Sequence, residues 1–279
     1  MNELTVGDGV FLGIIQGLTE FLPVSSSAHL AIAQKWLGLK PDSTPILLFD
    51  MATHVGTLVA LWLVFAGPIH RFLRRLKGEC RADWPAGKRY AWRIAALAVA
   101  ATIPTGVIGL LFKKMFEAAF NRPVEIGIEL IITGALLAIA ASWAQNRGRW
   151  RDFRWWHAGL VGVAQAVAIL PGISRSGATI SVAALCGLRR QWAAQFSFLI
   201  AFPAILGATT IMLKDTLDLP RDQLAATPWG AIAAGTVASL VVGILALVVL
   251  LRVIRRAKLH YFSWYCYLAG IYVLVLALF

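Results

Sequence analysis

Six apolar stretches, each long enough to cross a membrane, constrain this chain more than any other feature. About 20 consecutive apolar residues are needed for a helix to span the hydrocarbon core. A single segment in lipid must satisfy its own backbone hydrogen bonds, which favours helices over open strands. The stretches are 47–66, 93–112, 125–144, 194–213, 229–251 and 261–279. The sequence therefore predicts an all-α integral membrane protein with six transmembrane helices, forming one membrane domain over 1–279.

The composition agrees with this prediction. Hydrophobic residues make up 59% of the chain and charged residues 14%, whereas a soluble domain carries about 25% charged residues. The formal net charge of +12 would suggest a nucleic-acid partner in a soluble protein. Here the bases cluster in short loops between apolar stretches, where they set membrane orientation. We therefore expect membrane lipids as partners and no nucleic acid.

Neither a cysteine-based site nor a cleavable signal peptide is expected. The cysteines Cys80, Cys186 and Cys266 are scattered without the spacing of a disulfide framework or a zinc site. The N-terminal segment MNELTVGDGV has two acidic residues and no basic residue, so it lacks the charged region of a signal peptide. We expect no cleavage there.

Two other apolar regions are too short to span. Residues 10–22 end at Pro23 and residues 157–170 end at Pro171, and about 13 residues is the length of a re-entrant half-helix. A second short helical stretch follows each region, at 26–37 and at 175–188. The sequence thus predicts two re-entrant helical hairpins, at about 10–37 and 157–188.

The loop charges predict how these elements are inserted. Eighteen lysines and arginines fall in 67–93, 145–156, 187–192 and 252–260, against seven on the other side. The richer side is expected to be cytoplasmic, which leaves both termini outside. The first hairpin would then enter from outside and the second from the cytoplasm, as in an inverted-topology repeat with halves of about 1–144 and 145–279.

A weak internal match supports the repeat. Gln16 precedes Ser25 by nine residues, and Gln165 precedes Ser174 by nine. In inverted repeats with broken helices, polar sites form near the membrane midplane where the halves meet. The functional chemistry is therefore expected at the two helix breaks, around Pro23 and Pro171.

The first hairpin contains QGLTEFLPVSSSAHL. Gln16 and Glu20 are four residues apart and share one helix face. Pro23 ends that helix, and Ser25 or Ser26 is expected to cap the next one. His29 lies three residues after Ser26, on the same face.

The second hairpin contains PGISRSGATI. Pro171 ends its first helix, Gly172 allows the turn, and Ser174 is expected to cap a helix that carries Arg175. An arginine at the bilayer centre costs about 2.5–3.5 kcal/mol on insertion scales. A phosphate group bound at the two helix N-termini, with Glu20 opposite, would offset that cost.

Simpler interpretations exist for each residue taken alone. The serines could be helix caps only, His29 a hydrogen-bonded core residue, and Glu20 with Arg175 a structural ion pair. Intramembrane charges are functional by default, and the combination in two hairpins favours a functional site. Asp50 and His54, four residues apart at the top of a span, are left undecided.

At these motifs the sequence resembles the bacitracin-resistance family of undecaprenyl-diphosphate phosphatases. The segments QGLTEFLPVSSSAH and PGISRSGAT match its two signature blocks, and the resemblance covers essentially the whole chain. It implies the same six spans, two hairpins and inverted repeat. It also implies a bacterial inner-membrane protein with a site open to the extracytoplasmic side. The implied active-site residues are Glu20, Ser26, His29, Ser174, Arg175, Ser176 and Thr179.

The resemblance further implies a divalent cation, Mg²⁺ or Ca²⁺, with Glu20 as a ligand. Three departures from the family pattern bear on this site. Gln16 replaces the first glutamate of many members, which weakens a two-carboxylate metal site. Ser27-Ala28 stands where Thr-Gly is common, and Gln195 stands where a glutamate often occurs.

These observations predict a membrane phosphatase that releases the terminal phosphate of a polyprenyl diphosphate, recycling the lipid carrier for peptidoglycan synthesis and conferring bacitracin resistance. Arg175 would clamp the diphosphate, and Ser26 would attack phosphorus with His29 as its base. Direct attack by water, with His29 or Glu20 as base, is the alternative. The remaining polar residues of the breaks would bind substrate: Gln16, Ser25, Ser27, Ser174, Ser176 and Thr179.

Two other classes remain open at this point. Inverted repeats with broken helices are also typical of transporters, so a transporter or flippase for an anionic lipid is the competing function. A structural scaffold would leave Glu20 and Arg175 unexplained. The sequence leaves the oligomeric state open between a monomer and a homodimer.

Overall fold

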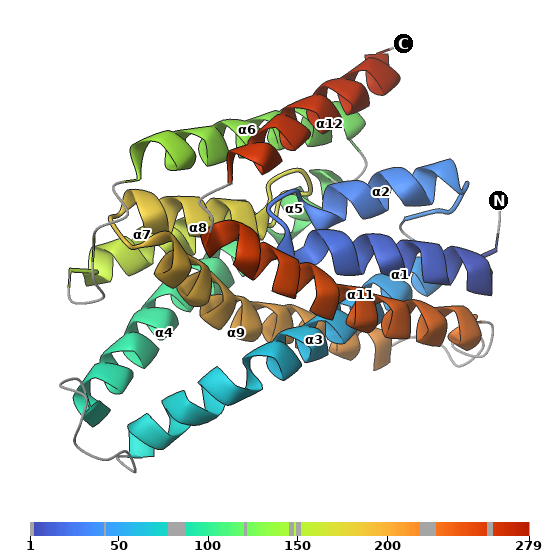
Figure 1. The fold of residues 1–279 in the computed structure, drawn as a ribbon. Coiled ribbons are helices and arrows are strands. Elements are labelled where there is room, and N and C mark those ends of the chain that lie inside the picture. Colours follow the sequence, from blue (N-terminus) through green and yellow to red (C-terminus); the bar gives the residue numbers. More distant parts are fainter. Residues whose placement is uncertain are drawn as a thin grey trace.

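The structure is a computed structural model that describes residues 3–41, 43–77, 87–119, 122–144, 148, 152–217, 227–255 and 259–278. Its helices follow one another along the chain (Figure 1). They are α1 (Val6–Phe21), α2 (Ser26–Trp36), α3 (Thr44–Lys77), α4 (Gly87–Leu111), α5 (Lys113–Ala119), α6 (Pro123–Trp143), α7 (Trp155–Val167), α8 (Arg175–Leu185), α9 (Arg190–Leu217), α11 (Trp229–Arg255) and α12 (His260–Leu278). Within the described ranges the one β contact is an isolated bridge between Gly148 and Leu188. The all-α prediction is confirmed.

Six of the helices in the described part of the chain are long and apolar enough to cross a membrane. The candidate spans are Thr44–Arg74, Ala91–Leu111, Pro123–Trp143, Arg190–Lys214, Trp229–Arg255 and His260–Leu278. Each overlaps one of the six predicted stretches. The expectation of a six-span chain is therefore confirmed by length and composition.

Of the shorter helices, α5 follows α4, and the other four form two pairs, α1 with α2 and α7 with α8. Thr5 and Asp8 form a capping box that starts α1, with Asp8 N donating to Thr5 Oγ1 at 3.1 Å. The helix ends at Phe21, two residues before Pro23. The α7 helix likewise ends at Val167, before Pro171. Proline cannot continue a helix and restricts the residue before it, so both breaks lie where the sequence predicts them.

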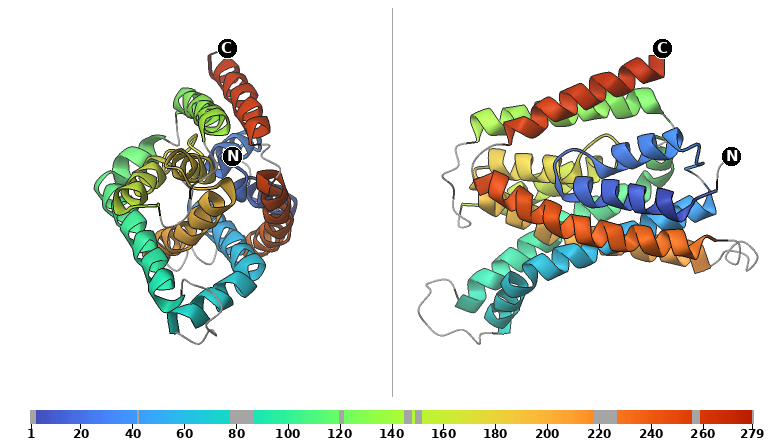
Figure 2. Two further views of the ribbon diagram at one scale, coloured as in Figure 1. Left: turned by 60° about the vertical axis from the view of Figure 1, so that its left-hand side comes forward. Right: turned by 45° about the vertical axis from the view of Figure 1, so that its right-hand side comes forward.

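The two halves of the chain pack reciprocally. The α1 helix packs on α11, and α7 packs on α4, so each first helix of a pair lies on a long helix of the other half. The α6 and α12 helices pair with each other along one side of the molecule (Figures 1 and 2). The α3 and α9 helices also contact each other across the halves. Each half thus packs largely against the other.

Small residues permit the close approach of α1 to α11. Gly9, Gly13 and Gly17 repeat every fourth residue along α1 and face the α11 backbone. A Cβ at Gly17 would lie only 2.7 Å from the Ser239 carbonyl oxygen. On α7, a Cβ at Gly162 would meet the Ala101 carbonyl of α4 in the same way. Small residues at every fourth position commonly allow membrane helices to pack closely.

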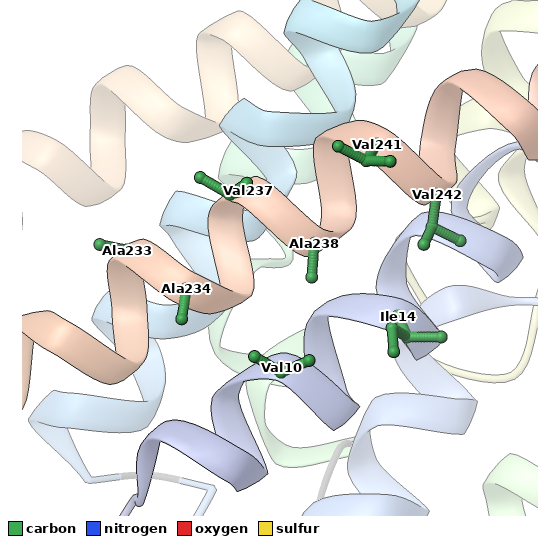
Figure 3. Close-up of a pocket in the computed structure, with 8 residues that line it drawn as sticks. All are labelled: Val10, Ile14, Ala233, Ala234, Val237, Ala238, Val241 and Val242. Atoms are coloured by element: carbon green, nitrogen blue, oxygen red, sulfur yellow. The ribbon is translucent and has the colours of Figure 1, made fainter.

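An apolar groove of about 650 Å³ lies between α1 and α11 (Figure 3). Its lining consists of valine, isoleucine and alanine side chains: Val10, Ile14, Ala233, Ala234, Val237, Ala238, Val241 and Val242. Such a surface offers no donor or acceptor side chain for a phosphate group. The buried polar cluster around Glu20 and Arg175 lies elsewhere, at the two breaks.

Candidate active site

The two breaks meet inside the molecule, where their connecting segments lie beside each other (Figure 1). Ser25 Oγ and Ser27 Oγ both donate to the Pro171 carbonyl oxygen, at 2.5 Å and 2.7 Å. In return, Ser176 Oγ donates to the Leu22 carbonyl oxygen at 3.1 Å. These bonds join residues more than 140 positions apart, so the halves are fixed to each other at the breaks.

Glu20 is the centre of the polar cluster. Its side chain is 3% exposed, and it accepts at Oε2 from Gln16 Nε2 at 2.9 Å and from Ser26 Oγ at 2.8 Å. His54 Nε2 on α3 lies 3.6 Å from the same oxygen. The other oxygen, Oε1, forms an ion pair with Arg175 Nη2. One carboxylate therefore connects α1, α2, α3 and α8.

Arg175 opens α8, where Ser174 caps the helix by accepting from Gly177 N at 3.1 Å. The predicted cap at Ser174 is confirmed. The Arg175 side chain is 19% exposed, and its Nη1 donates to the Ala201 carbonyl of α9 at 3.4 Å. Two of its five N–H donors thus have protein partners in these bonds, and Arg175 is the first residue of α8. Such a setting is suited to an anion.

Ser25 begins α2 in a different way. Its φ of +66° places a residue other than glycine in the left-handed region, and its side chain makes no cap bond. The hydroxyl instead reaches Pro171 across the interface. Backbone strain of this kind costs roughly 1–3 kcal/mol and persists where surrounding contacts impose it. The expectation that a serine side chain caps α2 is not met by Ser25.

His29 does not contact Ser26 through a hydrogen bond in the described residues. Its Nδ1 lies 2.7 Å from the Ser25 carbonyl oxygen, and its Nε2 lies 2.7 Å from the Tyr265 hydroxyl. Ser26 instead donates to Glu20. The structure therefore brings Ser26 to Glu20 and His29 to Tyr265.

The remaining predicted residues line the second break. Ser174 Oγ and Ser176 Oγ are 3.3 Å apart. Thr179 is fully buried, donates to the Arg175 carbonyl at 2.7 Å and lies 2.5 Å from Ser197 Oγ of α9. The Thr179 hydroxyl is thus engaged in contacts within α8 and with α9, whereas both serines lie at the N-terminal end of α8.

Sequence reasoning missed residues that support the breaks from other helices. Glu129 on α6 accepts from Gly172 N at 2.8 Å, and Thr133 Oγ1 accepts from Ser174 N at 3.0 Å. On α12, Cys266 Sγ donates to the Pro23 carbonyl at 3.4 Å. Glu129 was identifiable, because a charged residue inside a span is rare and often functional. Nothing marked Cys266 or Thr133 in the sequence.

Asp50 and His54, undecided from the sequence, form a polar track on α3. His54 Nδ1 donates to the Asp50 carbonyl at 2.7 Å, and Asp50 Oδ1 accepts from Gln34 Nε2 at 2.8 Å. Because His54 also approaches Glu20, polar contacts run from Gln34 of α2 through Asp50 and His54 of α3 to the Glu20 carboxylate.

The polar cluster offers few protein ligands for a metal ion. In the part of the chain that the structure describes, no three histidine, cysteine, aspartate or glutamate residues could hold one together. Both Glu20 oxygens already accept from protein donors. Gln16 Oε1 is buried without a partner and adds one amide oxygen beside the carboxylate, whereas a Mg²⁺ ion at a phosphate site completes its shell with phosphate oxygens and water. The described residues therefore hold no preformed cage of protein ligands for a divalent cation.

Comparison with known proteins gives one consistent family. Residues 9–272 match the family described as "Bacitracin resistance protein BacA". A protein of Alkaliphilus metalliredigens named "Undecaprenyl-diphosphatase" is 40% identical over 99% of this chain and 100% of its own length. Proteins of the same name from Carboxydothermus hydrogenoformans and Syntrophotalea carbinolica are each 42% identical. These matches cover 96% and 94% of this chain, and 95% of each relative.

Proposed function

The chain belongs to the bacitracin resistance protein BacA family, and from this premise we propose that it is an undecaprenyl-diphosphatase. It hydrolyses undecaprenyl diphosphate to undecaprenyl phosphate and inorganic phosphate. The observation that carries the proposal is the meeting of Glu20, Ser26 and Arg175 where two half-helices begin. A carboxylate, a hydroxyl and a guanidinium at one point can serve as proton acceptor, nucleophile and phosphate-binding group in the hydrolysis of a phosphoanhydride bond.

The architecture belongs to the same proposal. We propose that α1–α2 and α7–α8 are re-entrant hairpins of an inverted-topology repeat. Support comes from the reciprocal packing of α1 on α11 and α7 on α4, and from the bonds between the two breaks. A site at the interface of two such halves is where inverted repeats usually bind their ligands.

Arg175 and the N-termini of α2 and α8 would hold the diphosphate. The guanidinium presents a planar set of donors that suits two phosphate oxygens, and free N–H groups at helix starts add to it. Ser174 and Ser176 flank Arg175 at the start of α8; Ser174 would donate to a phosphate oxygen, and Ser176 would do so when its hydroxyl turns from the Leu22 carbonyl. In the transition state these donors would stabilise the charge that develops on phosphorus-bound oxygens.

Ser26 is the proposed nucleophile, with Glu20 as its proton acceptor. The Ser26 hydroxyl already donates to Glu20 Oε2 at 2.8 Å, which is the geometry expected of a hydroxyl and its base. As Oγ bonds to phosphorus, the bond to the lipid phosphate breaks and the hydroxyl proton passes to Glu20. Water then releases phosphate from Ser26, with His29 as the base. Direct attack by water on the diphosphate is the competing route.

Phosphate release from purified protein in detergent tests the proposal. One inorganic phosphate should appear for each undecaprenyl monophosphate formed. Detergent micelles do not separate two compartments, so a transporter or flippase would release no inorganic phosphate. A purified, folded protein without turnover would refute the phosphatase function.

The proposed orientation places the α5 end outside and the end of α3 in the cytoplasm, as the loop charges indicate. In a cysteine-free background, cysteine at exposed Met115 should react with a membrane-impermeant reagent in intact cells. Cysteine at exposed Lys77 should react only after permeabilisation. The reverse pattern would place the site on the other side of the membrane.

A further inference from the structure

Tyr265, on α12, lies outside both sequence motifs and contacts the site through His29. Its hydroxyl is 2.7 Å from His29 Nε2, and the two rings lie nearly parallel, with centroids 5.7 Å apart and planes 12° apart. Tyr265 is 46% exposed, so the pair lies at the edge of the protein where α12 passes α2. A second ring contact, between Trp36 and Tyr272, joins the same two helices.

The contacts of His29 determine which nitrogen is basic. Nδ1 faces the Ser25 carbonyl oxygen at 2.7 Å, and a carbonyl oxygen only accepts hydrogen bonds. Nδ1 therefore carries the hydrogen, and Nε2 is the basic nitrogen of the neutral ring. The Tyr265 hydroxyl donates to it. Any proton that His29 takes up must arrive at the atom that Tyr265 covers.

The geometry points to Tyr265 as a positioning residue for His29 in the proposed phosphatase reaction. The Ser25 carbonyl sets the tautomer, and the Tyr265 hydroxyl holds the ring from the opposite side. When Nε2 is protonated in the phosphate-release step, it becomes a donor, and the tyrosine oxygen accepts from it after the tyrosine hydrogen rotates away. The pair thus holds the ring in one place in both protonation states, without oxidation or a further reactant. The inference rests on the proposed function, because it assigns Tyr265 a part in that reaction.

Tyr265→Phe keeps the ring and removes only the hydroxyl. We expect kcat for undecaprenyl diphosphate to fall about five- to tenfold, the effect of one hydrogen bond to a catalytic group, with little change in KM. In a His29→Ala background the same substitution should cause no further loss. Tyr272→Phe, on the same helix and 50% exposed, is the matched control and should leave kcat unchanged.

A second readout does not depend on turnover. In ¹⁵N spectra of histidine-labelled protein, Tyr265→Phe should shift the Nε2 signal of His29 and leave that of His157 in place, and Tyr272→Phe should move neither. Full activity in Tyr265→Phe, or an unmoved Nε2 signal, would overturn the inference while the phosphatase function stands. Equal losses with and without His29 would show a structural role only. An inactive wild-type protein would instead remove the proposed function.

Discussion

The two breaks have similar sequences but are held in different ways. The first break, LPVSSS, reaches α2 through Ser25 at φ +66°, without a side-chain cap. The second break, LPGISRS, reaches α8 through Ser174 at φ −69°, with a cap bond to Gly177 N. The strained break carries Ser26, whereas the relaxed break carries Arg175. Strain accompanies the proposed nucleophile, and regular helix geometry accompanies the anion-binding group.

Support from neighbouring helices follows the same division. On the second break, Glu129 and Thr133 of α6 bind two backbone N–H groups. On the first break, α12 contributes the weak Cys266 thiol donor to a carbonyl oxygen. The first break depends more on the second one, since Ser25 and Ser27 both bind Pro171. The second break therefore positions the first.

The largest expected effect concerns Arg175. Arg175→Lys keeps the charge beside Glu20 but cannot reproduce planar, paired donation to phosphate. We expect phosphate release to fall about 10²-fold or more, as when a transition-state donor is removed. The surface substitution Arg122→Lys, in an exposed pair with Glu125, should have no effect. Near-normal turnover in Arg175→Lys would refute the clamp.

Ser26→Ala tests the chemistry of the strained break. If Ser26 attacks phosphorus, nearly all activity is lost, and rapid quenching of the wild-type reaction with labelled substrate traps phosphate on Ser26. If water attacks, the variant loses one hydrogen bond, roughly 0.5–1.5 kcal/mol or about a tenfold effect. Ser174→Ala removes a cap worth about 1 kcal/mol and should leave the trapped phosphoserine detectable. A modest Ser26→Ala loss without trapped phosphate would end the covalent route.

The sequence predicted much of this arrangement. The apolar stretches indicated the spans because a helix must match the thickness of the hydrocarbon core. Pro23 and Pro171 marked the breaks, and Glu20 with Arg175 stood out as charges in apolar surroundings. The partners of these residues were harder to predict, because sequence spacing gives the face of one helix and not its neighbours. Ser26 and His29 share a spacing, yet one reaches Glu20 on α1 and the other Tyr265 on α12.

Ser25 shows a second limit of sequence reasoning. A serine after a proline is a common helix cap, so local preference predicted a cap bond. The Pro171 carbonyl from the other half offers a competing partner at 2.5 Å. A tertiary contact therefore overrides the local one, and the strained φ follows from it.

Glu129 tests how strongly α6 supports the second break. Glu129→Ala leaves the buried Gly172 N–H without an acceptor, which should cost about 1–3 kcal/mol. Glu129→Gln still offers an oxygen and should recover most of that loss. Thermal unfolding in detergent measures both variants. Cys266→Ala is the corresponding change at the first break. It removes only a weak donor and should lower stability less than Glu129→Ala does. A larger loss in Cys266→Ala would mean that α12 supports the first break more strongly than α6 supports the second.

The smallest effect isolates the strain at Ser25 from its hydrogen bond. Ser25 and Ser27 donate to the same carbonyl of Pro171, so alanine or glycine at either position removes an equivalent bond. At residue 25 the positive φ favours glycine, and Ser25→Gly should be more stable than Ser25→Ala by roughly 1 kcal/mol. Ser27 lies within α2, where glycine is disfavoured, so Ser27→Gly should be less stable than Ser27→Ala by up to about 1 kcal/mol. The order of the two variants should therefore reverse between positions two residues apart. Thermal unfolding of the four proteins in one detergent measures it, and alanine more stable than glycine at both positions would mean that Ser25 is not strained.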